Sequence, residues 1–236
     1  MNSLWVLGGG GPSDDCITIV ASPDAALQYD RRVKINTGNP MTGHVVEAVL
    51  SFWFVEGTVP GLCEYRPIWI ASSPEFDAAI ETRFSDTFER AAAEELDNLA
   101  TTPEGALALI IILDQFPRNL FRNSPRAFAT DAKARTLCHQ AVARGADKKL
   151  TGIQRIFCYL PLQHSEEIED QMRSVQLFDS LGDEMVFHFI QEAARRHLGI
   201  IERFGRFPHR NGCLGRASTP AERDFLESGE GRFWTH

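Results

Sequence analysis

Three similar helix starts recur along this chain, and they constrain its fold more than any other feature. Each places a serine or threonine before a proline and an acidic residue shortly after it. The hydroxyl can cap free backbone N–H groups, proline fits the first helical turn, and the acid faces the positive end of the helix dipole. The starts are Ser73-Pro74-Glu75, Thr102-Pro103-Glu104 and Thr219-Pro220-Ala221-Glu222.

Apolar residues between these starts recur at helical spacing. From Asp183 to Phe204 they step by three or four positions, as Ile190, Ala193, His197 and Ile201 illustrate. We find no convincing strand pattern, and no Asn-Gly or Asp-Gly step joins two strand-like runs as in a hairpin. Helices are predicted over about residues 43–56, 74–95, 103–115, 126–145, 151–160, 166–181, 183–204 and 220–228. We therefore predict an all-α fold of about eight antiparallel helices.

The first forty residues lack this periodicity. Residues 1–42 are predicted to be a flexible or non-native extension, and residues 43–236 a single all-helical domain. Met41 directly precedes the first predicted helix, which makes it a candidate for the natural start of translation. The glycine run Gly8–Gly11 is not followed by the Lys-Ser/Thr of a phosphate-binding loop, and Leu4–Leu7 is too short for a signal peptide.

Charge and composition exclude several classes of protein. The net charge of −8 argues against general affinity for nucleic acids or anionic membranes. The longest apolar run, Ala106–Leu113, is too short to span a bilayer. The five cysteines are scattered and form no CxxC pair, a pattern typical of reduced thiols in the cytoplasm. A cytoplasmic protein with neither a nucleic acid nor a membrane as its partner is predicted.

One phrase occurs twice, as Phe116-Pro117-Arg118-Asn119 and as Phe207-Pro208-His209-Arg210-Asn211. Proline disfavours helical geometry in the residue before it, so each phrase predicts a helix end followed by a polar turn. If the helices alternate in direction, the connections after the third, fifth and seventh helices lie at the same end of the stack. The middle connection carries His164-Ser165-Glu166. We therefore expect Arg118, His164 and His209 to lie near one another.

These three connections supply the candidate site residues. Guanidinium groups bind carboxylates and phosphates in bidentate fashion, which favours a small anionic molecule or an acidic peptide end as the ligand. The candidate ligand-binding residues are Asp114, Gln115, Arg118, Asn119, Arg206, Arg210, Asn211 and Arg216. The alternative is a hydrolase or transferase in which His164 and His209, with Glu166, act as acid and base groups. A third hypothesis gives the polar turns a purely structural role.

The structural hypothesis has a specific form for each residue. Asp114 and Arg118 can form a clamp between helix ends, because buried ion pairs are often architectural. Asn119 and Asn211 suit left-handed or capping positions after a helix. Ser165 is typical of a helix start. His197 is predicted to be a core imidazole because it lies on the apolar face of its helix.

Metal binding and cysteine chemistry receive little support. His164, Glu166 and His209 have side chains that can bind zinc, but there is no HExxH pair and the nearby arginines would repel a cation. No metal or other cofactor is predicted. Cys213 has basic neighbours but no evident general base beside it.

Several long phrases of the sequence run from Thr102 to Leu109, Leu113 to Asn119, Tyr159 to Leu162, His164 to Glu166 and Arg203 to Asn211. Together they resemble the mainly bacterial family known as domain of unknown function 924. The resemblance covers about residues 44–228 and implies an all-helical, tetratricopeptide-like fold, with no reaction established. The family commonly has Trp-Phe where this chain has Trp69-Ile70, and often an aromatic residue near Asn98 or Leu99.

Overall fold

A computed structural model describes residues 40–54, 66–69, 73–183 and 185–228 of the chain. These residues fall within one compact unit. Every regular element in these ranges is helical, which confirms the predicted all-α fold. The first helix begins at Pro40, three residues before its predicted start, and the rest of the predicted extension lies outside the described residues.

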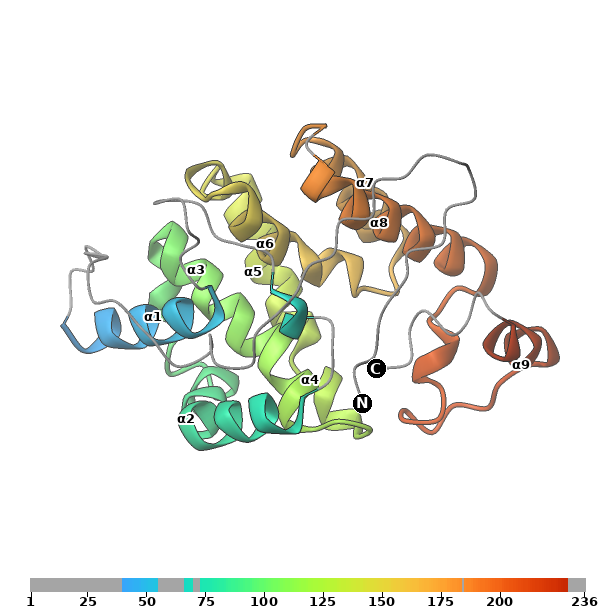
Figure 1. The fold of residues 1–236 in the computed structure, drawn as a ribbon, viewed down its shortest axis with the longest axis horizontal. Helices are drawn as coiled ribbons and strands as arrows, with labels where there is room; N and C mark the ends of the chain where they lie inside the picture. The colour runs from blue at the N-terminus through green and yellow to red at the C-terminus, as the bar shows by residue number, and fades with distance from the viewer. Residues whose placement is uncertain (1–39, 55–65, 70–72, 184, 229–236) are drawn as a thin grey trace, which may run out of the picture. The chain divides into compact units, whose positions relative to one another are not determined.

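Among the described residues, eight helices correspond to the eight predicted, and a further short one, Phe116–Leu120, was not predicted (Figure 1). They are α1 (Pro40–Trp53), α2 (Pro74–Ala92), α3 (Pro103–Ile110), α4 (Phe116–Leu120), α5 (Asp131–Ala143), α6 (Gly152–Gln163), α7 (Ile168–Asp179), α8 (Met185–Phe204) and α9 (Pro220–Glu227). A π-helical turn, Ile111–Gln115, joins α3 to α4. Short 3₁₀ turns lie at Pro67–Trp69, Asp97–Thr101, Pro125–Phe128, Asp147–Lys149 and Pro208–Arg210.

All three predicted helix starts are confirmed. Ser73 and Thr102 each accept a hydrogen bond from the backbone N–H three residues later, at 3.3 and 3.1 Å. Thr219 and Glu222 form a reciprocal capping box, in which each side chain accepts from the other residue's backbone N–H. The hydroxyl-proline-acid pattern therefore located these helices correctly.

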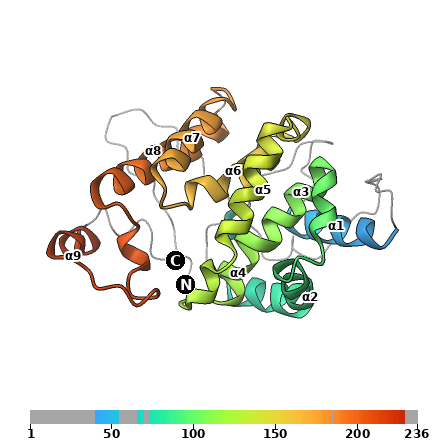
Figure 2. The same ribbon diagram turned by 180° about the vertical axis from the view of Figure 1, so that it is seen from behind.

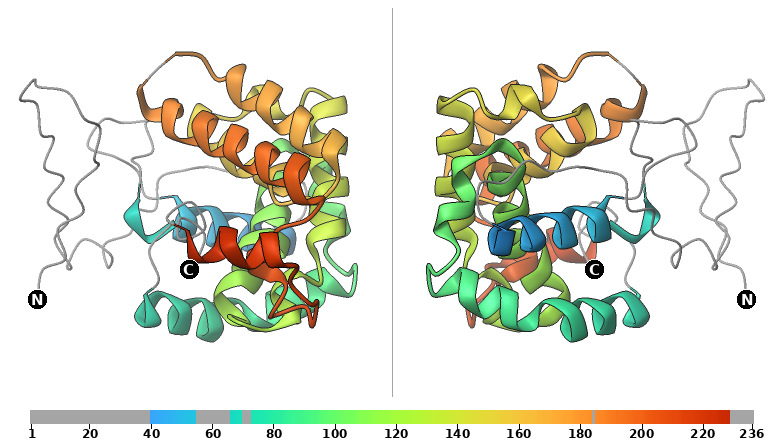
Figure 3. Two further views of the ribbon diagram at one scale, coloured as in Figure 1. Left: turned by 90° about the vertical axis from the view of Figure 1, so that its right-hand side faces the viewer. Right: turned by 90° about the vertical axis from the view of Figure 1, so that its left-hand side faces the viewer.

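The core is built around α3, whose residues from Gly105 to Ile110 are all buried. This helix packs against α1, α5 and α6. Figure 2 shows α5 and α6 side by side, and Figures 1 and 3 show the same for α7 and α8. The tetratricopeptide-like arrangement of these helices stays a prediction.

The first Phe-Pro phrase does not end a helix, contrary to the prediction. Phe116 has helical backbone angles, φ −58° and ψ −41°, and the chain stays helical to Leu120. The π turn lets the helix continue past the proline. In this turn the N–H of Phe116 donates to the carbonyl of Ile111, five residues earlier. Pro117 has no N–H for the carbonyl of Leu113, and the Thr130 hydroxyl donates to that carbonyl instead, at 2.5 Å.

The second phrase ends its helix as predicted. α8 stops at Phe204, and Gly205 follows with φ +66°, the left-handed geometry that glycine adopts at helix C-termini. Phe207 is extended, as expected before a proline. The fifth helix was predicted to end at residue 160, but α6 continues through Pro161, and the N–H of His164 still bonds the carbonyl of Leu160 at 2.9 Å.

Candidate functional site

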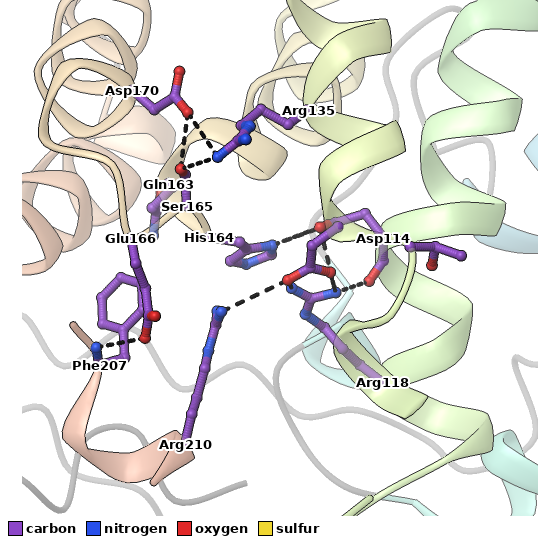
Figure 4. A network of polar contacts seen from close by, with 12 residues as sticks. Asp114, Arg118, Arg135, Gln163, His164, Ser165, Glu166, Asp170, Phe207 and Arg210 are labelled. Carbon is purple, nitrogen blue, oxygen red and sulfur yellow. Dashed lines mark hydrogen bonds and ion pairs between the residues drawn. The ribbon is translucent and has the colours of Figure 1, made fainter. Parts of the chain in front are cut away.

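The three connections that carry the candidate residues meet in one polar network (Figure 4). Asp114 lies on the π turn, His164 is the residue that caps the C-terminus of α6, and Arg210 ends the 3₁₀ turn after α8. Asp131, at the start of α5, joins Arg118 to Arg210. Segments nearly one hundred positions apart therefore contribute side chains to one place.

Asp114 is at the centre of this network and has no exposed surface. Its carboxylate oxygens lie 2.9 and 3.0 Å from Nδ1 of His164, and one lies 3.3 Å from Nη1 of Arg118. The Gln115 amide also donates to it, at 2.5 Å. Burial alone would raise the pKa of Asp114, but the charge of Arg118 and the contacts with His164 outweigh burial and hold the pKa below its usual value. Asp114 is therefore ionised at neutral pH.

His164 is neutral in this arrangement. Burial lowers the pKa of its imidazole, and the nearby arginines lower it further against the opposing effect of Asp114. Since an ionised carboxylate can only accept, Nδ1 carries the hydrogen and Nε2 keeps a free lone pair. Nε2 makes no hydrogen bond to any described residue. It is not one of the fully buried polar atoms that lack a partner, so it is accessible to solvent.

Arg118 and Arg210 share Asp131 unequally. Arg118 forms two 3.0 Å hydrogen bonds with the Asp131 carboxylate. Arg210 lies 3.6 Å from the same carboxylate, beyond hydrogen-bond distance, and it makes no hydrogen bond to any residue that the structure describes. Its guanidinium carbon lies 4.7 Å from the centre of the Phe128 ring and 4.7 Å from that of Phe207. Two aromatic rings therefore hold a guanidinium whose donors are largely unused.

Arg210 is almost completely buried, and this affects its pKa. Only 9% of its side chain is exposed. Burial, followed by repulsion from Arg118, lowers the pKa of Arg210 to about 10. The guanidinium stays charged at neutral pH, and the nearby acidic side chains do not balance its positive charge completely.

A cavity of about 420 Å³ lies beside these groups. Its polar lining includes His164, Arg210, Arg135 and Ser165, together with the acids Asp131, Glu166 and Glu167. Its apolar lining consists of Pro125, Phe128, Ala129, Ala132, Pro161 and Leu214. The open nitrogen of His164 and the guanidinium of Arg210 thus border the same space.

A second polar network flanks the cavity around Asp170. The Ser165 hydroxyl donates to the Asp170 carboxylate at 2.8 Å and accepts from Arg135 at 2.9 Å. His139 lies 2.7 Å from the other carboxylate oxygen. These contacts use the hydroxyl of Ser165 and hold the guanidinium of Arg135 in place. Both groups are therefore less available to a ligand than Arg210.

Glu166 forms no hydrogen bond with a histidine among the described residues, although the catalytic hypothesis required one; it acts on His209 only through its charge. Its carboxylate forms two hydrogen bonds with Arg216, at 2.7 and 3.0 Å, and accepts from the backbone N–H of Phe207 at 2.8 Å. Arg216 also donates to the Phe207 carbonyl. The Glu166–Arg216 pair therefore anchors the Phe-Pro turn, and Asp114 takes the place beside His164.

The other predicted residues lie nearby with different contacts. His209 packs against Phe207, with ring centres 5.5 Å apart, and burial lowers its pKa to about 3. Arg206 pairs with Glu222 at the start of α9, away from the cavity lining. Asn119 donates to Asp77 at 2.7 Å.

The structural predictions for four single residues have different outcomes. Asn119 is inside α4, so the prediction for it is wrong. Asn211 is not left-handed, with φ −58°, but it occupies the predicted capping position, as the C-cap of the 3₁₀ turn Pro208–Arg210. Ser165 is not the N-cap of α7, which is Glu167, but its hydroxyl accepts a hydrogen bond from the backbone N–H of Glu167 at 3.1 Å. His197 is a buried core residue, with Nδ1 3.0 Å from the Gln163 amide nitrogen and 2.8 Å from the Ala193 carbonyl.

Sequence reasoning missed Asp131, Phe128, Arg135 and Asp170. They lie on α5, on the turn before it and on α7, outside the three connections. Asp131 resembles an ordinary acid in a first helical turn, so it gave no signal in the sequence.

The described residues contain no cluster of three metal-binding side chains. None of the helices described is both long and apolar enough to cross a membrane.

Comparisons with known proteins agree on the relationship. Residues 49–230 match the family described as bacterial protein of unknown function, DUF924. A solved structure, of a protein of unknown function from Agrobacterium tumefaciens, is similar at 43% identity with a TM-score of 0.64. The match covers 68% of this chain and 89% of that one. Among curated proteins, none matches. The chain therefore belongs to the DUF924 family of bacterial proteins of unknown function.

Proposed function

We propose that the cavity binds a small organic anion and that Arg210 holds its negative charge. The observation that carries this proposal is a guanidinium that is nine-tenths buried, borders the cavity and makes no hydrogen bond to any described residue. A buried charge without hydrogen-bond partners is costly. An anion in the cavity would supply the missing acceptors, and charge-assisted bonds to arginine are among the strong hydrogen bonds of proteins.

The surroundings of Arg210 favour an anion of low total charge. Repulsion from Arg210 contributes to the lowered pKa of both His164 and His209, so the field near the guanidinium is positive. Three acids, Asp131, Glu166 and Glu167, also line the cavity and oppose further negative charges. A monoanion satisfies both conditions better than a dianion or a phosphate ester.

The lining also suits a ligand with an apolar part. Phe128, Pro161 and Leu214 contribute to the walls, and a volume of about 420 Å³ is within the range of small-molecule sites. A carboxylate with a short hydrocarbon or aromatic body fits this description, and so does the carboxyl end of a peptide with an apolar last residue.

Thermal shift with a set of anions tests the proposal. We expect benzoate or phenylacetate to raise the melting temperature, since a ligand at ten times its dissociation constant stabilises the folded state by about 1.4 kcal/mol. Arg210→Met should abolish the shift. Arg195→Met is the matched control, because Arg195 pairs with Asp179 on the surface. The proposal fails if no monoanion stabilises the protein, or if Arg210→Met binds as well as the wild type.

A second candidate function is acid–base catalysis at the same cavity. The observation that favours it is the pair of Asp114 and His164, in which a buried carboxylate orients a neutral imidazole whose other nitrogen is open. Glu166 and His209 have no part in it. Hydrolysis of p-nitrophenyl acetate by the wild type, at a rate that His164→Gln loses and Arg195→Met retains, would support this function; equal rates in all three proteins would eliminate it.

A further inference from the structure

One hydrogen-bond acceptor at the cavity, Nε2 of His164, has a fixed orientation and no partner among the described residues. The bond from Nδ1 to Asp114 fixes the plane of the ring and the position of its hydrogen. This leaves Nε2 as an acceptor that cannot rotate away. Because His164 lines the cavity and Nε2 meets no described residue, a ligand atom is its natural partner.

Most of the other polar side chains around the cavity already have partners within the protein. Ser165 uses its hydroxyl with Asp170 and Arg135, and Glu166 is held by Arg216. Asp131 accepts two hydrogen bonds from Arg118. Glu167 also lines the cavity, but it is exposed and its negative charge disfavours an anion. The groups that remain to bind an anionic ligand are therefore a charged donor, Arg210, and a neutral acceptor, His164.

A ligand complementary to this pair carries an anionic group and a hydrogen-bond donor. We infer that the cavity binds a small monocarboxylic hydroxy acid with an apolar body, its carboxylate on Arg210 and its hydroxyl donating to Nε2 of His164. The inference rests on the proposed function and adds the second contact. We expect the site to bind a hydroxyl in preference to an ammonium group at Nε2, because an ammonium would bring a further positive charge towards Arg118 and Arg210.

A pair of probes that differ by one hydroxyl tests this inference. Mandelate and phenylacetate share the carboxylate and the phenyl ring, and mandelate alone has the hydroxyl. Calorimetric titration of the wild type should show mandelate binding about three- to tenfold more tightly, the difference that one net hydrogen bond provides. Phenylglycine, which replaces the hydroxyl with an ammonium group, should bind less tightly than mandelate.

The variant His164→Phe completes the cycle. It keeps a flat ring but removes the acceptor, so mandelate should lose its advantage over phenylacetate. If His164→Phe does not fold, NMR of wild-type protein with ¹⁵N-labelled histidine replaces it. Nε2 of His164 should then shift on adding mandelate and much less on adding phenylacetate.

The outcomes separate the two proposals. If neither acid binds, the proposed function fails. If both bind equally to the wild type, if mandelate keeps its advantage in His164→Phe, or if Nε2 responds equally to both acids, the hydroxy-acid inference is wrong and the anion site stands. Tighter binding of phenylglycine than of mandelate would also overturn it, in favour of an amino acid.

Discussion

Nδ1 of His164 lies 2.9 and 3.0 Å from the two carboxylate oxygens of Asp114, a residue 50 positions earlier in the chain. Asp114 lies on the π turn between α3 and α4, and His164 caps the end of α6. Both elements pack together in the core, so the contact is fixed by the fold and not by a loop. The pair therefore has consequences for stability as well as for the cavity.

Replacing Asp114 with asparagine should lower the free energy of unfolding by about 3 kcal/mol, since removing one partner of a buried ion pair leaves the other poorly compensated. Arg118 keeps Asp131, which limits the loss. Urea unfolding measures the effect. The control is Asp179→Asn, in an exposed pair with Arg195, which should cost less than about 1 kcal/mol. A loss at Asp114 no greater than at Asp179 would show that the pair is not structural.

The hydroxyl of Thr130 should stabilise the proline-containing turn. Thr130→Val leaves the carbonyl of Leu113 without its donor, at an expected cost of about 1–2 kcal/mol. In a Pro117→Ala background the backbone N–H returns, so the same substitution should cost less. Thr136→Val, at an exposed helical threonine whose hydroxyl bonds the Ala132 carbonyl, is the matched control and should change stability by less than about 0.5 kcal/mol. Equal costs with and without Pro117 would contradict this account of the turn.

The helix starts were predictable because capping depends on residues close in sequence, as at Thr219 and Glu222. The meeting of the three connections at one site was also predictable, because it follows from helices that alternate in direction. The π turn was not predictable, because it depends on a hydrogen bond that the Thr130 hydroxyl donates from another segment. The partners of Glu166 and His164 were likewise hidden, since several charged residues in these connections have complementary groups and only tertiary packing selects among them.

Acidification should destabilise the protein before its carboxylates titrate. Burial lowers the pKa of His197 to about 3, against about 6.5 in an unfolded chain. Between these values the unfolded state binds a proton that the folded state does not, so stability is full above pH 6.5 and falls as the pH drops. His197 should contribute a loss of about 1.3 kcal/mol between pH 7 and pH 5.5. Urea unfolding at both values should show a smaller loss in His197→Gln, and parallel losses would contradict the assignment.

The binding anchor should be dispensable for folding. Arg210 is a buried guanidinium without hydrogen bonds to the described residues, and replacing such a group with an apolar one is often neutral or stabilising. Methionine fits between Phe128 and Phe207, whose rings now hold the guanidinium. Arg210→Met should therefore unfold with a free energy unchanged or raised by up to about 2 kcal/mol, while the melting-temperature shift with phenylacetate disappears. Arg118→Met is the contrasting variant, because Arg118 bonds Asp131 and the Asp114 carbonyl, and it should be destabilised by several kcal/mol. Similar destabilisation of both variants in urea would mean that Arg210 is a structural clamp, and the case for a ligand on it would be lost.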